Sequence, residues 1–445
     1  MNGHSAWSYA PYLPFDRKNE ALLPYICRLA PYENFVEIEW FDKGAENEGH
    51  TLCYSVRSSG EWHKRPVSEN IITIHCLEID TEYEIFIERE DGVRSNTRLV
   101  RTGSVLGTVI NYLHPEDPQY SFVGQYLCSP SIVRLDSGAL IASMDIFQKD
   151  GPRNLSLVFR SEDDGESWHY LTDLFPCFWG TPFVHNGQLY MLSVSNKYGD
   201  LLLGYSDDSG ETWSTPVALM RGSCLANCKG FHRAPMPVIK HSGRIWVSLD
   251  FGGWESAQMD TTLVSIDENA DLTVAENWVF SEPLPHDKTW ENALNIMGGL
   301  EGNAIPAPDG NIVTMLRYND NKALVLKSDV SDPHKQASFV KILDFPMGHT
   351  KFEVRRHPSG KYYAIGNTLP GRNVLAMYVS NDLENWTFER NIADYSHMSV
   401  KTTAFQYPDF MFNGENEILL VSRTALNGAD NFHNNNYVTF HRVKI

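Results

Sequence analysis

Short runs of alternating apolar and polar residues fill the first part of the chain, and turn-forming residues separate them. NFVEIEWF, HTLCYSVR, NIITIHCLEI, EYEIFIER and TRLVRTG all occur between residues 21 and 103. Alternation with a period of two is typical of strands with one buried face, so this pattern predicts a small antiparallel β-sandwich over 21–103. Residues 1–20 contain Pro and polar residues without a period, and we expect them to form a lead-in.

From residue 104 to residue 445 the chain repeats another pattern, a turn ending in Gly followed by an apolar strand. The repeats read DSGALIASMDIF, HNGQLYMLSVS, HSGRIWVSLDF, PDGNIVTMLRY, PSGKYYAIGNT and FNGENEILLVSRTA, with turn glycines Gly138, Gly187, Gly243, Gly310, Gly360 and Gly414. Repeats of this length, each with several short strands, are typical of β-propellers. The sequence therefore predicts an all-β protein, with a six-bladed β-propeller over 104–445 after the sandwich.

The closure of such a ring needs one blade that combines strands from both ends of the domain. The last repeat ends in NYVTFHRVKI, and no further strand follows it. Segment 106–113, LGTVINYL, is apolar and precedes the first repeat, so we expect it to supply the missing outer strand.

Two segments match the pattern Ser-x-Asp-x-Gly-x-x-Trp, and a third is a degenerate copy. They are SEDDGESW (161–168), SDDSGETW (206–213) and SNDLENW (380–386). The pattern predicts a tight turn in which the Asp side chain accepts N–H groups, Gly takes a positive φ and Trp packs beneath. We therefore interpret Asp163 and Asp208 as structural residues.

Candidate chemistry gathers just before the first strand of each repeat, where a propeller has the mouth of its central channel. A single His or Tyr there would more often be structural, but polar groups at equivalent points of several repeats indicate a shared pocket. The candidates are Trp179, His232, Arg233, Glu301, His349, Lys351, Tyr407 and Asp409.

Arg317 and Arg423 each follow an apolar strand. They could form internal salt bridges or clamp a planar anion, since guanidinium pairs bidentately with carboxylate. His433 lies among three Asn residues in GADNFHNNNYV. That loop could be a simple turn, or its amides and imidazole could bind sugar hydroxyls.

The composition limits the possible partners. A net charge of -19 argues against broad binding to nucleic acids or anionic membranes, although a local basic cleft could still hold an anionic small substrate. The N-terminus has no signal-like segment and no long apolar run occurs, so we expect a soluble chain, cytoplasmic or supplied without its signal. The seven Cys are expected to be mostly free core thiols, and Cys224 and Cys228 lack zinc-site spacing, so no metal or cofactor is predicted.

Two resemblances sharpen the fold. Trp40, Leu77, Thr81 and Tyr83 lie in a context similar to fibronectin type III domains, whose Tyr packs at a strand corner. The Asp boxes, the six repeats and Glu301-x-x-x-Ile-x-x-x-Pro-Asp-Gly followed by Arg317 resemble the sialidase superfamily. That resemblance implies a Glu that orients a Tyr nucleophile, and Glu301, Arg317 and Tyr407 keep the pattern. The first of the three sialidase arginines is replaced, because Ser131 and Ile132 stand at its motif.

Residues 104–445 are more closely similar to bacterial sialidase-like propellers that act on rhamnosyl-glucuronate linkages. GTVINYL, SPSIVRLDSGALIAS, FWGTPFVHNGQLY, HRAPMPV, LEGNAIPAPDG, FQYPDF and VSRTA…HNNNYVTFHR carry this resemblance. In the α-L-rhamnosidases of that group an Ala-Ser-His-Asp motif supplies the catalytic histidine, and Met144 takes its place here. The resemblance therefore favours the lyase members, which cleave by β-elimination.

The leading hypothesis is an enzyme that cleaves an acidic oligosaccharide or polysaccharide at a uronate by β-elimination. His232 or Tyr407 would act as base or acid. Arg317 and Arg423 would clamp the carboxylate, Trp179 would stack on sugar, and Glu301 would orient a partner or bind hydroxyls. The alternatives are an exo-glycoside hydrolase of the sialidase type that uses Tyr407 and Glu301, and a glycan-binding propeller without catalysis.

Overall fold

The computed structural model describes residues 23–42, 44, 49–113, 126–147, 153–223, 229–253, 258–294 and 297–445, together with Trp7. In these ranges nearly every regular element is a strand, and the one helical element is the 3₁₀ turn η1 (Ala275–Asn277). The prediction of an all-β protein is therefore confirmed. Within the described ranges, no helix has the length and apolar character that a membrane-spanning helix needs.

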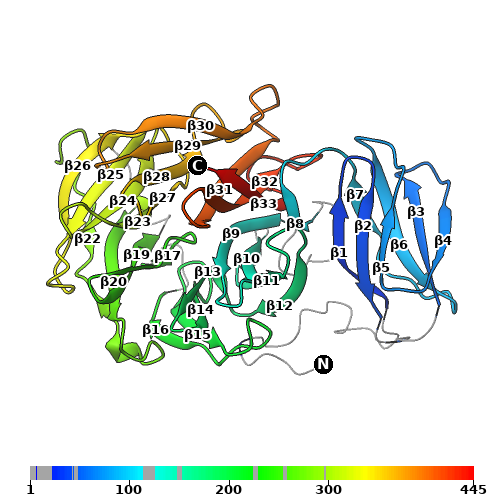
Figure 1. The fold of residues 1–445 in the computed structure, drawn as a ribbon, viewed down its shortest axis with the longest axis horizontal. Coiled ribbons are helices and arrows are strands. Elements are labelled where there is room, and N and C mark those ends of the chain that lie inside the picture. Colours follow the sequence, from blue (N-terminus) through cyan, green and yellow to red (C-terminus); the bar gives the residue numbers. More distant parts are fainter. Residues whose placement is uncertain are drawn as a thin grey trace.

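The N-terminal strands form two antiparallel sheets, drawn in blue in Figure 1. One has the order β1-β2-β5 and the other the order β4-β3-β6-β7. The strands are β1 (Tyr25–Pro31), β2 (Val36–Phe41), β3 (His50–Val56), β4 (His63–Val67), β5 (Ile71–Ile74), β6 (Glu82–Arg89) and β7 (Arg98–Arg101). Ile38 of the first sheet and Leu52 and Ile85 of the second belong to one buried cluster. At the corner before β6 the Tyr83 hydroxyl accepts the N–H of Glu78 at 2.8 Å.

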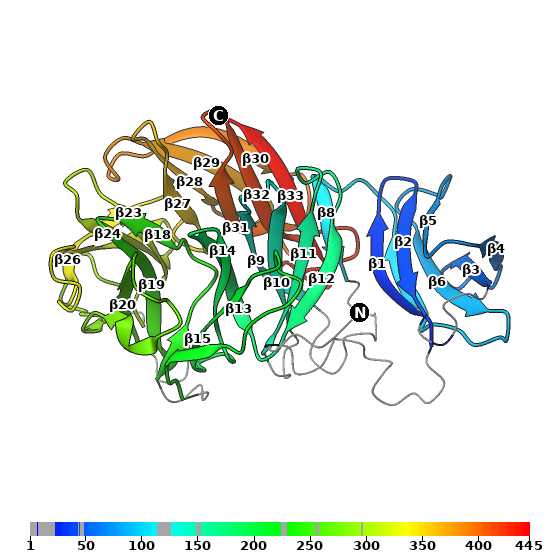
Figure 2. The same cartoon turned by 60° about the horizontal axis from the view of Figure 1, so that its bottom comes forward.

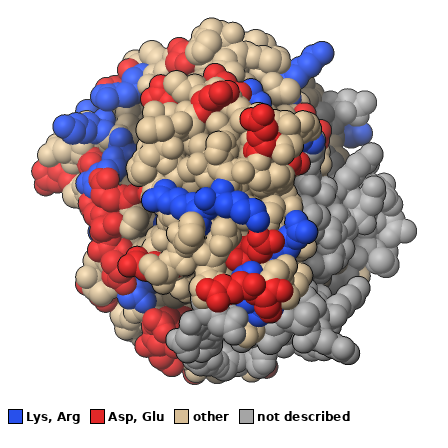
Figure 3. All heavy atoms as spheres, turned by 90° about the vertical axis from the view of Figure 1, so that its right-hand side faces the viewer, with Lys and Arg blue, Asp and Glu red and all other residues tan. Residues whose placement is uncertain are grey.

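Strand β4 lies at the edge of its sheet and carries residues that discourage pairing with another chain. Lys64, Arg65 and Pro66 are all exposed, and Lys64 pairs with Glu88 of β6 at 3.1 Å. Charged residues and Pro are common protective features of edge strands. Figure 3 looks onto this end of the molecule and shows a strip of basic side chains bordered by acidic ones.

The described strands after residue 107 form six antiparallel sheets that follow one another along the chain. Figures 1 and 2 show them arranged around a common centre, with the N-terminal sheets to one side. The first three sheets contain β9 (Tyr126–Arg134), β10 (Leu140–Phe147), β11 (Leu155–Ser161) and β12 (His169–Leu174); then β13 (Phe178–His185), β14 (Gln188–Val194), β15 (Leu201–Ser206) and β16 (Val217–Met220); then β17 (Gly230–His232), β18 (Ile239–His241), β19 (Arg244–Gly253), β20 (Gln258–Asp267), β21 (Val279–Phe280) and β22 (Leu284–Pro285).

The other three sheets contain β23 (Leu300–Pro306), β24 (Ile312–Asn319), β25 (Lys322–Ser328) and β26 (Ser338–Asp344); then β27 (Glu353–Arg356), β28 (Tyr362–Asn367), β29 (Val374–Ser380) and β30 (Thr387–Asp394); then β31 (Ala404–Phe412), β32 (Glu417–Ala425), β33 (Tyr437–Lys444) and β8 (Thr108–Tyr112). In that last sheet β8 pairs antiparallel with β33, with Val109 opposite Thr439 and Tyr112 opposite Tyr437. Segment 106–113 thus supplies the outer strand, as the sequence predicts.

The repeated turns have the geometry that their residues favour. The six repeat glycines all have positive φ, between 69° at Gly414 and 97° at Gly138. In the first Ser-x-Asp-x-Gly-x-x-Trp turn, Asp163 accepts the N–H of Ser167 at 2.9 Å and Gly165 has a φ of 93°. Trp168 is fully buried beneath that turn. Asp163 lies in the turn between β11 and the edge strand β12, and β12 is at the opposite edge of the sheet from β9.

Of the four cysteines with described side chains, Cys53, Cys128 and Cys177 are buried and Cys76 is exposed, and none forms a disulfide. Cys224 and Cys228 lie outside the described residues.

Buried polar side chains near the centre bind the backbone of the next sheet. Asp145 on β10 accepts the N–H of Trp179 on β13 at 2.9 Å. Asp250 on β19 accepts the N–H of Glu301 on β23 at 2.8 Å. Each of these carboxylates is about 1% exposed. Because a buried N–H without a partner is costly, these contacts fix the relative position of neighbouring inner strands.

The same kind of contact continues around the centre with other side chains. Arg233 reaches back to the second sheet, where it donates to the Leu192 carbonyl at 2.8 Å and the Thr181 hydroxyl at 2.7 Å. Asn303 on β23 accepts the N–H of Val354 on β27 at 2.8 Å. Asp409 on β31 accepts the N–H of Ile132 on β9 at 2.8 Å, which joins the last sheet to the first.

Between the fifth and sixth sheets the contact is ionic. Lys351 and Arg355 flank the Glu353 carboxylate at 3.0 Å and 2.6 Å, and Arg355 also reaches Asp409 at 2.9 Å. Lys351 donates in addition to the Pro408 carbonyl. Burial, together with the neighbouring charge of Asp409, raises the pKa of Glu353 to about 7.

Asn303→Ala tests whether these central contacts hold the sheets together. The change removes the acceptor of the Val354 N–H and the donor to the Phe352 carbonyl at 3.3 Å, both fully buried. We expect the free energy of unfolding in urea to fall by about 2 kcal/mol. Asn416→Ala, at an exposed position, is the control and should change it by less than about 0.5 kcal/mol. Equal effects of the two substitutions would contradict the structural role of Asn303.

Candidate active site

Four inner strands carry a β-bulge at the same position, and the bulged residue faces the centre. Register shifts occur in the pairings of β9, β13, β23 and β31 with the following strands. At these shifts Ser129, Trp179, Glu301 and Tyr407 have φ values of 50°, 55°, 55° and 50°. A non-Gly residue in the left-handed region costs about 1–3 kcal/mol, and such strain is concentrated at functional sites.

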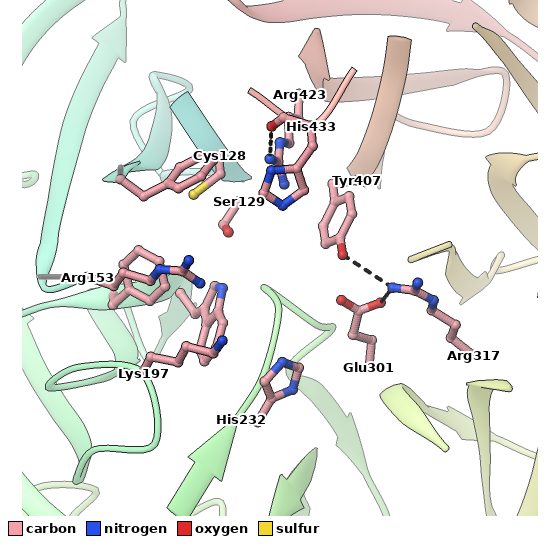
Figure 4. Close-up of a pocket in the computed structure, with 13 residues that line it drawn as sticks. Cys128, Ser129, Arg153, Lys197, His232, Glu301, Arg317, Tyr407, Arg423 and His433 are labelled. Carbon is pink, nitrogen blue, oxygen red and sulfur yellow. Dashed lines mark hydrogen bonds and ion pairs between the residues drawn. The ribbon is translucent and has the colours of Figure 1, made fainter. Parts of the chain in front are cut away.

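All four bulged residues line one cavity of about 300 Å³ at the centre of the sheets (Figure 4). The polar lining includes four basic side chains and one carboxylate. The lining residues are Cys128, Ser129, Phe147, Arg153, Phe178, Trp179, Lys197, His232, Glu301, Arg317, Tyr407, Arg423 and His433.

Glu301, Arg317 and Tyr407 form a hydrogen-bonded group on one side of this cavity. Arg317 Nη1 lies 3.2 Å from Glu301 Oε2 and 3.3 Å from the Tyr407 hydroxyl. Glu301 is 4% exposed. Although burial alone would raise its pKa, Arg317 and His232 hold the pKa of Glu301 below its usual value. The carboxylate is therefore ionised at neutral pH.

Tyr407 is surrounded by charged groups. The guanidinium carbon of Arg423 lies 5.2 Å from the centre of its ring, and that of Arg372 lies 5.9 Å away. Burial and the Glu301 charge raise the pKa of Tyr407, against the lowering effect of the arginines. A phenol with a raised pKa keeps its proton at neutral pH, so Tyr407 is suited to donate one.

His232 lies across the cavity from Tyr407 and is oriented by a carboxylate. Its Nδ1 is 3.3 Å from Asp250 Oδ2, and the same oxygen accepts the Glu301 N–H. The imidazole packs edge-on against the Trp179 ring, with ring centres 4.7 Å apart. A buried carboxylate that contacts one ring nitrogen fixes the orientation of an imidazole, as in catalytic His–Asp pairs. Burial raises the pKa of Asp250.

The positive charge of the site also acts on His433. The charge of Arg423, together with burial, lowers the pKa of His433 to about 4. Arg423 is held in place because its Nε donates to Asn435 Oδ1 at 2.6 Å and its Nη2 donates to the His433 carbonyl. In a protein with a net charge of -19, this cavity is thus locally cationic.

Most of the site residues predicted from the sequence meet in this cavity, namely Trp179, His232, Glu301, Arg317, Tyr407, Arg423 and His433. Four others do not line it. Arg233 and Lys351 are at most 1% exposed and hold neighbouring sheets together, and His349 is partly buried outside the lining. Asp409 likewise joins the last sheet to the first.

Sequence reasoning missed part of the site. Ser129 could have been found, because CSPS aligns with FWGT, LEGN and QYPD once the bulge is known. Arg153 and Lys197 come from connections between strands, where no repeat pattern marks them. Arg372, which donates to Gln406 Oε1 at 2.6 Å behind Tyr407, also lies in such a connection. Within the described residues, no group of His, Cys, Asp and Glu has the geometry of a metal site.

Comparison with known proteins places the chain in a class and then in a family. A solved microbial sialidase described as Hadza Hz136 has a similar fold, with a TM-score of 0.54, 13% identity and 98% of both chains covered. An α-L-arabinanase from Penicillium chrysogenum has a TM-score of 0.51 and 12% identity, covering 76% of this chain and 98% of its own. The α-L-arabinofuranosidase of Fusarium graminearum has a TM-score of 0.50, 11% identity and the same coverage.

These likenesses define a sialidase-like, all-β class of fold. The BNR repeat-like domain matches residues 181–419, and the chain belongs to that family. None of the curated proteins matches the chain.

The cationic surroundings of His433 can be tested by titration. In the intact protein we expect His433 to titrate near pH 4, because protonation would place a charge beside Arg423. Arg423→Gln should move the midpoint upward toward the usual value of about 6.5, whereas Arg423→Lys, which keeps the charge, should move it less. Side-chain NMR of His, assigned with His433→Gln, measures the midpoint. A midpoint near 6.5 in the unaltered protein would be incompatible with a cationic site.

Proposed function

We propose that this protein is a carbohydrate-active enzyme that cleaves a glycosidic bond at a uronate-containing sugar by β-elimination, with a rhamnosyl-glucuronate-type linkage as substrate. In this proposal, the six sheets are the blades of a sialidase-like propeller over 104–445, and 21–103 is a fibronectin type III-like sandwich. The fold likeness to a sialidase and an arabinanase supports action on a glycan.

One observation carries the proposal. An imidazole oriented by Asp250 and a protonated Tyr407 hydroxyl face each other across a cavity in which, among the described lining residues, basic side chains outnumber carboxylates. β-Elimination next to a carboxylate needs a base, an acid and a cation that stabilises the enolate-like intermediate. The described lining residues supply all three.

In the proposed elimination, each of these side chains has one role. His232 takes the proton from C5 of the uronate, and Arg423 neutralises the carboxylate as negative charge develops on it. The C5–H electron pair forms the C4=C5 double bond as the bond from C4 to the leaving oxygen breaks. Tyr407 donates its proton to that oxygen. Glu301 and Arg317 hold the Tyr407 hydroxyl in position.

The ionised Glu301 beside Tyr407 also favours a second candidate, an exo-glycoside hydrolase of the sialidase type. There Glu301 would accept the phenolic proton as Tyr407 attacks the anomeric carbon. The raised pKa of Tyr407 supports the acid role over the nucleophile role. A non-catalytic glycan-binding protein is the third candidate.

The reaction type can be read from the product. Incubation with rhamnosyl-glucuronate oligosaccharides should produce absorbance in the band of unsaturated uronates, because elimination leaves a C4=C5 double bond conjugated with the carboxylate. Chromatography of the same samples measures released sugar. Sugar release without that absorbance would replace elimination by hydrolysis, and neither signal on a broad glycan panel would leave binding alone.

Variants of the proposed base and acid separate the two mechanisms. His232→Ala and Tyr407→Phe should each lower kcat by about 10²–10⁴-fold, since each removes one proton-transfer group. His334→Ala and Tyr205→Phe are matched controls outside the lining and should keep wild-type rates. Circular dichroism and thermal unfolding establish that the variants fold. A severe loss for Tyr407→Phe with a nearly unchanged His232→Ala would favour the hydrolase.

A further inference from the structure

We infer that the N-terminal sheets hold one wall of the cavity in place, because they support the loop 426–436, which in turn positions Arg423 and His433. The N-terminal sheets are then part of the architecture of the site and not an independent module. Leu426 and Asn427, where the loop meets these sheets, are positioning residues. The placement of Arg423 does not depend on the reaction, but its effect on substrate affinity rests on the proposed function.

The N-terminal sheets share one buried cluster with the last sheet and with both ends of the loop. The cluster contains Val36 and Val100 from the N-terminal sheets together with Phe405, Leu426 and Tyr437. Leu426 is 1% exposed and Tyr437 is fully buried. Figures 1 and 2 show β1 beside β8, the outer strand of the last sheet. A shared apolar core restricts the relative motion that separate domains otherwise have.

Asn427 packs directly on the backbone of Gly103, just after β7. The Gly103 N–H donates to the Tyr32 carbonyl at 2.9 Å, and the neighbouring Thr102 hydroxyl donates to the Glu78 carbonyl at 2.5 Å. This segment is therefore fixed within the N-terminal sheets. A Cβ at Gly103 would lie 2.8 Å from Asn427 Nδ2, and the φ of Gly103 is 139°. Glycine thus permits a close approach that another residue would prevent.

The two ends of the loop are joined by the side chain of Asn436. Its amide nitrogen donates to the Leu426 carbonyl at 2.7 Å, and its oxygen accepts the Leu426 N–H at 3.2 Å. Asn436 is fully buried, and its own carbonyl accepts the N–H of Leu113 at 2.7 Å. Because buried polar groups are costly without partners, a displacement of Leu426 also displaces Asn436.

The residues just before Asn436 hold Arg423. Asn435 Oδ1 accepts the Arg423 Nε–H at 2.6 Å, and the His433 carbonyl accepts from Arg423 Nη2. Figure 4 shows Arg423 and His433 side by side at the cavity. The Arg423 guanidinium lies 5.2 Å from the centre of the Tyr407 ring. Contiguous contacts therefore run from the N-terminal sheets to the cation that faces the proposed acid.

The last contact of this series is sensitive to small movements. A shift of about 1 Å would carry the Arg423–Asn435 pair, now at 2.6 Å, beyond hydrogen-bond distance. A guanidinium that loses such a directional contact gains rotamer freedom and faces the cavity for less of the time. Its effect on His433 and on a bound carboxylate then falls.

Two substitutions in the full-length protein disturb the contact from opposite sides. Gly103→Ala places a methyl group against the Asn427 side chain. Asn427→Gly removes that side chain and suits the φ of 47° at this position, so it is the milder change for folding. Circular dichroism and thermal unfolding establish that each variant folds.

The first readout is the titration midpoint of His433, measured by side-chain NMR. The charge of Arg423 is the largest cause of its lowered pKa, and Arg372 and Arg153 also lower it. Each variant should move the midpoint upward from near pH 4 by at least about half a unit, while the other two arginines keep it below about 6.5. A smaller shift in both folded variants would overturn the inference.

Matched controls carry the same exchanges at left-handed positions elsewhere. Gly92 has a φ of 87° with open space around a Cβ, and Asn186 has a φ of 52° in the turn between β13 and β14. Gly92→Ala and Asn186→Gly should leave the His433 midpoint unchanged, and equal shifts in these controls would reject a specific contact. In Gly103→Ala/Asn427→Gly the shift should be smaller than the sum of the single shifts, because the added methyl group no longer meets Asn427.

The second readout is carboxylate binding in the Tyr407→Phe background, which prevents turnover. Calorimetry compares a rhamnosyl-glucuronate disaccharide with its uronate methyl ester, and the ratio of the two Kd values measures how strongly the carboxylate is bound. Gly103→Ala and Asn427→Gly should each lower this ratio by about threefold or more, and Arg423→Gln should lower it further.

The two readouts separate the inference from the proposed function. If neither disaccharide binds, the proposed substrate is wrong, and the His433 midpoint still decides whether the N-terminal sheets position Arg423. If the carboxylate is bound but the midpoint and the ratio stay constant in Gly103→Ala and Asn427→Gly, the positioning role is rejected and the proposed function is kept.

Discussion

Neighbouring sheets are joined near the centre by buried side chains that satisfy the backbone of the next sheet. The Asp250 carboxylate is the contact on which the site most depends, because one oxygen accepts the Glu301 N–H at 2.8 Å and lies 3.3 Å from His232 Nδ1. A buried carboxylate without such partners would be costly in free energy. The same Asp250 carboxylate therefore both joins two sheets and orients the His232 imidazole. The position of the His232 imidazole is thus tied to the packing of two sheets.

The bulges show how strain and packing are combined. Ser129, Trp179, Glu301 and Tyr407 take a left-handed backbone conformation that regular strands avoid. Each bulge turns one side chain into the cavity, while Ser131, Thr181, Asn303 and Asp409, two positions later, are buried and contribute to contacts between sheets. The strain is tolerated because these contacts determine the local conformation. Because the bulge is repeated in four sheets, residues that are far apart in the sequence lie in one site.

The electrostatics of the cavity differ from those of the whole protein. A chain with a net charge of -19 concentrates Arg153, Lys197, Arg317 and Arg423 around one space. The same field keeps Glu301 ionised and lowers the pKa of His433 to about 4. An overall negative charge limits non-specific binding of polyanions, while the cavity itself is locally cationic.

The sequence by itself determined the all-β class, the pairing of 106–113 with the end of the chain and most of the lining residues. These follow from local rules, since period-two alternation, glycine turns and position in a repeat are visible without the third dimension. The blade count and the N-terminal sandwich stay predictions. Only the tertiary structure decided which polar residues face the cavity. Arg233 and Lys351 lie next to lining segments in the sequence, but their side chains bind neighbouring sheets. In four other sheets a bulge turns the lining side chain inward. Arg153, Lys197 and Arg372 come from connections without periodicity, so their positions depend on how separate sheets meet.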